Sequence, residues 1–377
     1  MNNYLDKCAQ KLTKIHYSIV PNTADDFLRS HSRLKLAKKF LHRYVSLAAS
    51  GQLRREIRRI EAGMRVLWIY AGKSNFGDAI MDLSGRALLR NANIALELLT
   101  LSKLQPLFSE DDVFARVYSS VEQIEDRGYD AIVLNEFNYQ SIDLKVRYFA
   151  KLPFACLFQY FYGPDRNQTL FSFAAVNAVF QRGLGDSELL EVAKPYLSVH
   201  ETTRRAVDQL FSEAAPDLAL AVGGIDVRRT YDAWLAVLQW LDRTGVGDAP
   251  LRVALLGSDN GLAIARDIAN HAFHRLEVNS FVADLSLLEA REVVARCRLF
   301  VGCDGGLMHV AHTTDTPSLS LFAHLEPPHL RLTKRCQSLA IHSKGGVNEV
   351  APETVARAII GRLAPVERER NAGVPLL

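Results

Sequence analysis

Short apolar runs alternate with amphipathic stretches over most of the chain, from Met64 to Leu363. Continuous runs such as VLWIY at 66–70 are typical of buried strands, and apolar positions three to four residues apart are typical of helices. Strands alternating with helices predict a parallel sheet with crossover helices. The pattern occurs twice, so we expect an α/β chain of two tandem Rossmann-like domains behind a basic helical N-terminal extension.

The predicted elements divide between two halves. Strands are expected at residues 66–70, 94–99, 131–134 and 156–161 in the first half, and at 218–222, 253–256, 299–303 and 319–322 in the second. Helices are expected at residues 78–91, 200–213, 231–243, 262–273, 287–297 and 352–363. The expected domains are a helical basic extension at 1–62, Rossmann-like domains at 63–200 and 201–347, and a closing helix and tail at 348–377.

The extension carries most of the basic character. Residues 29–59 hold ten Lys or Arg and one acid, a charge of +9, so the rest of the chain is −6 within a total of +3. Apolar residues at helical spacing predict one packed helix face, formed by Leu34, Ala37, Leu41, Tyr44 and Ala48. A basic amphipathic helix can dock on the body of the protein or on an anionic membrane surface, and both interpretations stay open.

Composition excludes several classes of protein. Hydrophobic residues make up 48% and charged residues 23%, which is ordinary for a globular protein. No apolar run approaches the ~20 residues of a membrane span, and the N-terminus lacks a signal-peptide core. Five cysteines without a CxxC pair argue against a disulfide framework and a zinc site. We expect a cytoplasmic protein that binds no nucleic acid, since basic charge is local.

An acid, two glycines and two histidines follow one another closely at residues 301–317, VGCDGGLMHVAHTTDTP. A buried-type strand ends at Asp304, and Gly305 and Gly306 allow a ligand to approach the backbone closely. The helix that follows offers free N–H groups and a positive dipole end, which suit a phosphate, and His309 could donate to the same anion. The alternative is structural, with Asp304 as a helix N-cap and His309 as a satisfied core residue.

This stretch resembles the C-terminal motif of glycosyltransferase family 9, the heptosyltransferases, written D-[ST]-G-x-x-H-x-A-x-x-x-x-x-P. Gly223-Gly224 with Arg229-Thr-Tyr-Asp-Ala-Trp234, and Phe76-Gly77-Asp78-Ala-Ile, are similar to further family motifs. The resemblance covers roughly residues 64–365. It implies a GT-B fold, inverting transfer without a metal or cofactor, and a nucleotide-sugar donor, ADP-linked in preference, with heptose as a candidate sugar.

The resemblance also implies roles for individual residues. Asp78 would be the general base for the acceptor hydroxyl, although a helix N-cap is the alternative. Arg229 would stabilise the departing diphosphate, with Arg228 as a competitor. The remaining donor-binding candidates are Gly223, Gly224, Arg228, Gly257, Asp259, Asp304, Gly305, Gly306 and His309. The acceptor-binding candidates are Lys73, Ser74, Asn75 and Gly77.

The sequence departs from the family pattern at several positions. Gly305 stands where the family has Ser or Thr, and Ala323-His324 replaces a Gly-Pro pair. We expect a bacterial surface glycan or a lipopolysaccharide-type acceptor, with residues 29–59 on the inner face of the inner membrane. A sugar-nucleotide epimerase or hydrolase on the same fold, or a non-catalytic GT-B scaffold, remain alternatives.

Overall fold

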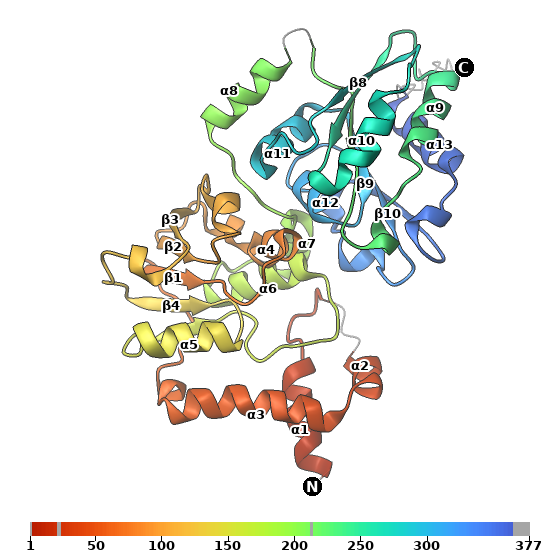
Figure 1. The fold of residues 1–377 in the computed structure, drawn as a ribbon. Coiled ribbons are helices and arrows are strands. Elements are labelled where there is room, and N and C mark those ends of the chain that lie inside the picture. The colour runs from red at the N-terminus through yellow and green to blue at the C-terminus, as the bar shows by residue number, and fades with distance from the viewer. Residues whose placement is uncertain (1, 21–23, 212–213, 365–377) are drawn as a thin grey trace, which may run out of the picture.

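The computed structural model describes residues 2–20, 24–211 and 214–364. It contains two fully parallel sheets, each covered by helices on both faces, with a group of N-terminal helices against the first domain (Figure 1). The two tandem Rossmann-like domains expected from the sequence are confirmed. None of the helices within those residues is both long and apolar enough to cross a bilayer.

The first domain is built on a five-stranded sheet of order β3-β2-β1-β4-β5. Its strands are β1 (Arg65–Ile69), β2 (Ala95–Leu99), β3 (Phe114–Tyr118), β4 (Ala131–Leu134) and β5 (Phe154–Cys156). Its helices are α4 (Phe76–Asp82), α5 (Tyr139–Tyr148), α6 (Gln168–Val179) and α7 (Asp186–Val192), with 3₁₀ turns η2 (Ser84–Leu89), η3 (Gln105–Phe108) and η4 (Val121–Gln123). One sheet face packs on α4 and α6 and the other on α5, so alternate strand residues enter two cores.

The second domain is built on a six-stranded sheet of order β11-β10-β9-β6-β7-β8. Its strands are β6 (Leu218–Ala221), β7 (Leu251–Leu256), β8 (Leu276–Ser280), β9 (Leu299–Cys303), β10 (Ser318–Phe322) and β11 (Ser338–His342). Its helices are α9 (Trp234–Thr244), α10 (Leu262–Ala269), α11 (Leu287–Arg296), α12 (Gly306–Ala311) and α13 (Pro352–Leu363), and α8 (Glu201–Leu210) links the domains. The 3₁₀ turns are η5 (Val227–Arg229), η6 (Asp259–Gly261), η7 (Pro328–Leu330), η8 (Lys334–Cys336) and η9 (Val347–Glu349).

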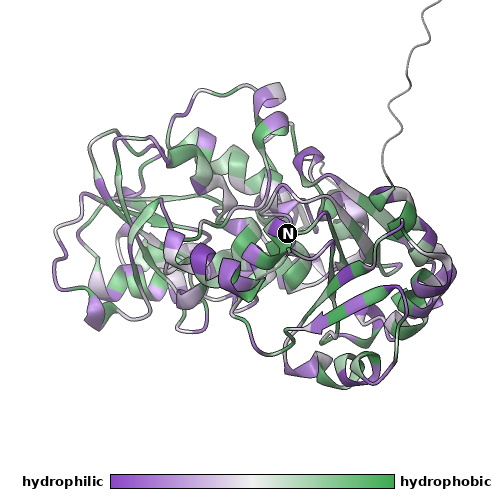
Figure 2. Cartoon of the chain, turned by 90° about the horizontal axis from the view of Figure 1, so that it is seen from above, coloured by the Kyte–Doolittle hydropathy of each residue, from purple (hydrophilic) through white to green (hydrophobic). Residues whose placement is uncertain are grey.

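The apolar strand interiors account for this two-sided packing. Figure 2 shows apolar colour along the strands and mixed colour on the outer helices. In the second domain, α9, α10 and α13 cover one face of the sheet, and α8, α11 and α12 cover the other. The closing helix expected near the C-terminus is therefore part of the core as α13, whereas the tail at 365–377 and residues 212–213 lie outside the described residues.

The N-terminal segment consists of α1 (Asn2–Thr13), α2 (Ala24–Ser30), α3 (Arg33–Ala49) and η1 (Gln52–Arg54). It is not separate from the first domain, because Ile19, Val20 and Ile60 join that domain's core. The chain at 55–57 runs beside β5: Phe154 N donates to Arg55 O (3.0 Å) and Ile57 N donates to Phe154 O (2.8 Å).

The packed face predicted for α3 is wrong in part. Leu36, Ala37 and Leu47 are buried, whereas Leu34 and Tyr44 are exposed. Apolar residues therefore occur on both sides of this helix. As a result, sequence spacing could not tell which side packs.

Several other element boundaries also differ. The helix predicted at 78–91 begins earlier, at Phe76, and becomes a 3₁₀ turn after Asp82. The strand predicted at 156–161 is instead β5 at 154–156, followed by a loop. Strands β3, β8 and β11 were not predicted.

Candidate active site

The candidate site lies where the carboxyl ends of the strands in the two sheets face each other. Helix α4, after β1, packs against α12, after β9. The two helices leave no room for a side chain at Gly77, where an added Cβ would lie 2.6 Å from Cδ2 of His309. Leu288 and Val310 of the second domain extend the core of the first. The turn at 304–306 and the helix carrying Asp78 thus meet across one interface, where ligands of such folds bind.

Asp78 is held in the first turn of α4 by neutral donors. Asn75 Nδ2 donates to Asp78 Oδ2 (3.2 Å), and Gln168 Nε2 donates to Asp78 Oδ1 (3.1 Å). Burial alone would raise its pKa, but the charge of Lys73, these two hydrogen bonds and the charge of His309 together hold the pKa below its usual value. Asn75, not Asp78, occupies the N-cap, so the N-cap alternative for Asp78 is wrong.

Asp304 directly follows β9 and is buried among basic side chains. Its carboxylate lies 3.6 Å from His309 Nε2, 3.6 Å from Arg331 Nε and 3.8 Å from Arg229 Nη1. Burial opposes ionisation, but contact with His309 and the two arginines holds the pKa of Asp304 below its usual value. The N-cap of α12 is Gly305, so the interpretation of Asp304 as an N-cap is wrong.

The two candidate arginines of η5 have different surroundings. Arg228 is half-exposed and pairs with Asp226 (Nη2–Oδ2, 2.7 Å), whose pKa falls to about 2 through hydrogen bonds from the side chain and backbone of Arg228. Arg229 is less exposed, reaches Asp304, and has a buried Nε without a hydrogen bond. Arg229 is therefore the arginine that the structure brings to the centre of the site.

The glycines of the site fall into two kinds. A Cβ would find nothing within 4 Å at Gly306 and only Cys303 O, at 3.7 Å, at Gly305, so the turn is open to a ligand. A Cβ on Gly223, whose φ is +81°, would meet Gly261 backbone at 2.7 Å; on Gly224 it would meet Thr230, and on Gly257 Val222 O. These three glycines allow backbone segments at the ends of β6 and β7 to pack closely.

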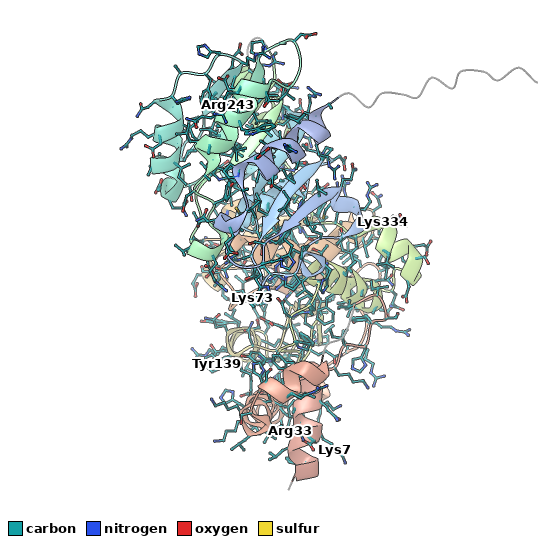
Figure 3. The ribbon with its side chains drawn as sticks, turned by 90° about the vertical axis from the view of Figure 1, so that its right-hand side faces the viewer. Lys7, Arg33, Lys73, Tyr139, Arg243 and Lys334 are labelled. Carbon is teal, nitrogen blue, oxygen red and sulfur yellow. The ribbon has the colours of Figure 1, made fainter. Side chains whose placement is uncertain are left out.

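The remaining predicted residues lie on the same edges. Asp259 is exposed in η6 after β7, and Ser74 is exposed in the loop before α4. Lys73, one of the acceptor-binding candidates, pairs with Asp82 (Nζ–Oδ2, 2.7 Å). Figure 3 places Lys73 near the middle of the molecule, far from Arg243 and from Lys7. Its ammonium group stabilises a buried carboxylate.

His312 does not belong to the site. It is buried, and its Nε2 lies 3.2 Å from Ser318 Oγ. Burial lowers its pKa to about 3, so the ring is neutral. This histidine is a structural residue at the C-cap of α12.

Sequence reasoning missed four charged or polar residues here. Asp82 is fully buried, and burial raises its pKa. Arg166 lies among the rings of Phe158, Phe161 and Phe171, with its Nε unpaired. Gln168 and Arg331 bind Asp78 and Asp304, as described above. Only Asp82, one helical turn after Asp78, left a sequence signal; the others depend on where their loops fold.

Comparison with known proteins agrees with this geometry. Residues 181–350 match the family model described as glycosyltransferase family 9 (heptosyltransferase). This is narrower than the resemblance at 64–365 and omits most of the first domain. No match to a curated protein sequence was found.

Solved structures resemble the chain over both domains. A glycosyltransferase family 9 protein from Veillonella parvula aligns with TM-score 0.64 and 13% identity, over 81% of this chain and 99% of that one. E. coli ADP-heptose LPS heptosyltransferase II aligns with TM-score 0.59 and 18% identity, over 80% of this chain and 98% of that one. E. coli heptosyltransferase WaaC with ADP aligns with TM-score 0.54 and 13% identity, over 78% of this chain and 97% of that one. The chain therefore shares the two-domain GT-B fold of these solved structures, and its residues 181–350 match the model of glycosyltransferase family 9.

Proposed function

We propose that this protein is an inverting, metal-independent glycosyltransferase that moves a sugar from a nucleotide-sugar to a hydroxyl of a bacterial surface glycan of the lipopolysaccharide type. The observation that carries the proposal is the packing of α4, which holds Asp78, against α12, which follows the turn at 304–306, across the domain interface. A base on one domain and a diphosphate seat on the other suit a single in-line displacement.

In this reaction Asp78 takes the proton of the acceptor hydroxyl. The acceptor oxygen then bonds to the anomeric carbon while the bond from that carbon to the diphosphate breaks on the opposite side, which inverts the configuration. Because its pKa is held low, Asp78 is ionised at neutral pH and ready to accept the proton. Its two hydrogen bonds from neutral amides fix its direction.

The second domain would stabilise the leaving diphosphate. Arg229 and Arg331 supply positive charge beside Asp304, and the open backbone at Gly305 and Gly306 leaves room for phosphate oxygens. Fixed positive charge where negative charge develops is commonly the largest catalytic contribution. Asp304 keeps both guanidinium groups in place, so we assign it a positioning role.

The donor proposed is an ADP-linked heptose. The support is the family model and the two E. coli neighbours, whose descriptions name ADP-heptose or ADP. The acceptor would lie on the first domain, beside Lys73, Ser74, Asn75 and Gly77. Arg166 offers a buried cation on that side, and its Nε has no hydrogen bond within the described part of the chain.

We also propose that α3 meets an anionic membrane surface. Its outward side combines Lys35 and Lys38 with exposed Leu34 and Val45, and the exposed ring of Tyr139 on α5 lies near His42. Basic residues with apolar and tyrosine side chains are typical of proteins that lie on bilayers. A membrane-bound acceptor would explain this surface.

The test of the reaction is Asp78→Asn with ADP-heptose as donor and deacylated lipopolysaccharide core as acceptor. Loss of the base should lower kcat by about 10²–10⁴-fold, while the Kd for ADP, measured by calorimetry, stays within about twofold. Wild-type turnover in the variant would rule out Asp78 as the base. Sugar release by the wild type without acceptor consumption would instead indicate a hydrolase.

A further inference from the structure

The N-terminal helices bind one loop of the first domain, the β5–α6 loop at residues 157–167. Leu12 O accepts from Tyr162 N (2.8 Å), and Arg43 Nη1 donates to Tyr160 O (2.9 Å). Both hydrogen bonds involve main-chain atoms of the loop. They therefore fix its path whatever its side chains do.

Side chains of α2 and α3 reinforce this contact. Lys39 Nζ lies 3.2 Å from the centre of the Tyr162 ring. The Phe27 ring packs so closely on Gly163 that a Cβ there would lie 2.6 Å from Cζ of Phe27. The segment 160–163 is thus held from three sides by residues that precede the first strand of the domain.

The far end of the same loop reaches the active site. Gln168, the first residue of α6, donates to Asp78. Asn167 Nδ2 donates to His329 O and to Leu332 O of the second domain, at 2.9 Å each. Asp165 pairs with Arg331 (3.2 Å), which also contacts Asp304. Gln168 therefore reaches one carboxylate of the site directly, and Asp165, three residues earlier, reaches the other through Arg331.

We propose that the N-terminal helices are a positioning element for the active site, acting through the β5–α6 loop to hold Gln168 on Asp78 and Asn167 on the second domain. This inference rests on the proposed function only where it treats Asp78 as the base. Arg43 is a positioning residue, because it touches neither of the carboxylates and acts through the loop backbone.

The physical reason lies in the length of the loop. A connection of this size without secondary structure is mobile unless anchored. Anchoring it at 160–163 leaves only a few residues free before Gln168, which limits how far Gln168 can move. Released from Arg43, the loop would spend less time with Gln168 donating to Asp78, and the carboxylate would lose a bond that favours its ionised form.

The test uses Arg43→Met, which keeps the aliphatic stem and removes the donor. Arg43→Lys is the conservative rescue, and Lys7→Met is the matched control, since Lys7 is an exposed cation of α1 away from the loop. Loss of one charged hydrogen bond should speed amide hydrogen exchange at 160–168 by about tenfold. Arg43→Lys should recover part of the protection, and Lys7→Met should match the wild type.

Two readouts separate positioning from general loss of structure. In a plot of kcat/KM against pH, the fall in activity on the acid side should move to higher pH. The reason is that losing the Gln168 hydrogen bond raises the pKa of Asp78. With ADP-heptose and deacylated lipopolysaccharide core, kcat should fall about tenfold while the Kd for ADP changes less than about twofold. If Arg43→Met does not fold, Lys39→Met, at a half-exposed position, should give a smaller change in the same direction, about two- to fivefold.

Unchanged exchange at 160–168 and an unchanged fall in activity on the acid side, in a folded Arg43→Met protein, would overturn the proposal. A fall in activity that only follows the unfolded fraction, with ADP binding lost in proportion, would overturn it as well. If the wild type itself does not turn over, the proposed function fails. Amide hydrogen exchange at 160–168 and an NMR titration of the Asp78 carboxyl carbon still decide whether Arg43 positions the loop, because neither measurement needs substrate.

Discussion

Gly77 of the first domain packs against His309 of the second, and Gly77→Ala tests that contact. The added Cβ would lie 2.6 Å from Cδ2 of buried His309, and ordinary contact begins near 3.4 Å, so α4 or the ring must shift by about 0.8 Å. Overpacking of this kind costs about 1–3 kcal/mol of unfolding free energy. A displacement of that size between the proposed base and the proposed donor site should also lower kcat/KM by up to ~10²-fold.

Urea unfolding and initial rates measure the two effects. Gly361→Ala is the matched control: nothing lies within 4 Å of its added Cβ, and alanine favours the helix α13 by about 1 kcal/mol. The cost of Gly77→Ala should fall to about 0.5 kcal/mol or less in a His309→Ala background, because the ring is gone. An equal cost in both backgrounds, or none in the wild type, would refute the contact.

Two further predictions concern the arginines and the membrane. Arg229→Met should lower kcat by about 10²–10³-fold, and Arg228→Met by less, because Asp226 already holds Arg228; a larger loss in Arg228→Met would reverse the assignment. Lys35→Gln with Lys38→Gln should weaken binding to phosphatidylserine vesicles by about 30-fold, at about 1 kcal/mol per charge, and leave binding to neutral vesicles unchanged. Equal binding of wild type and variant to both kinds of vesicle would exclude this surface.

The strands that the sequence pattern revealed are mostly those inside the sheets. Strands β1, β4, β6 and β9 are buried on both faces and read as continuous apolar runs. The three missed strands, β3, β8 and β11, are all sheet edges with exposed residues. A polar, half-exposed strand of five residues has no periodicity that separates it from a loop.

The residues of the candidate site also divide into those that the sequence could predict and those that it could not. Asp78, Asp304 and the glycine turns follow buried strands directly, so their place at the carboxyl edge could be predicted. Gln168, at the start of α6, and Arg331, directly after η7, follow segments whose course is set by contacts with other parts of the chain. Such residues become visible only when the fold brings the two domains together.

The hydrogen bonds between residues 55–57 and β5 have a practical consequence for shortening the protein. They occupy main-chain groups of Phe154 at the outer margin of the first sheet. Removing residues 1–62 would leave those main-chain groups without hydrogen-bond partners. An unpaired edge strand can then pair with strands of other molecules. A fragment intended to stay monodisperse should therefore begin before Gln52, even if only the two Rossmann-like domains are wanted.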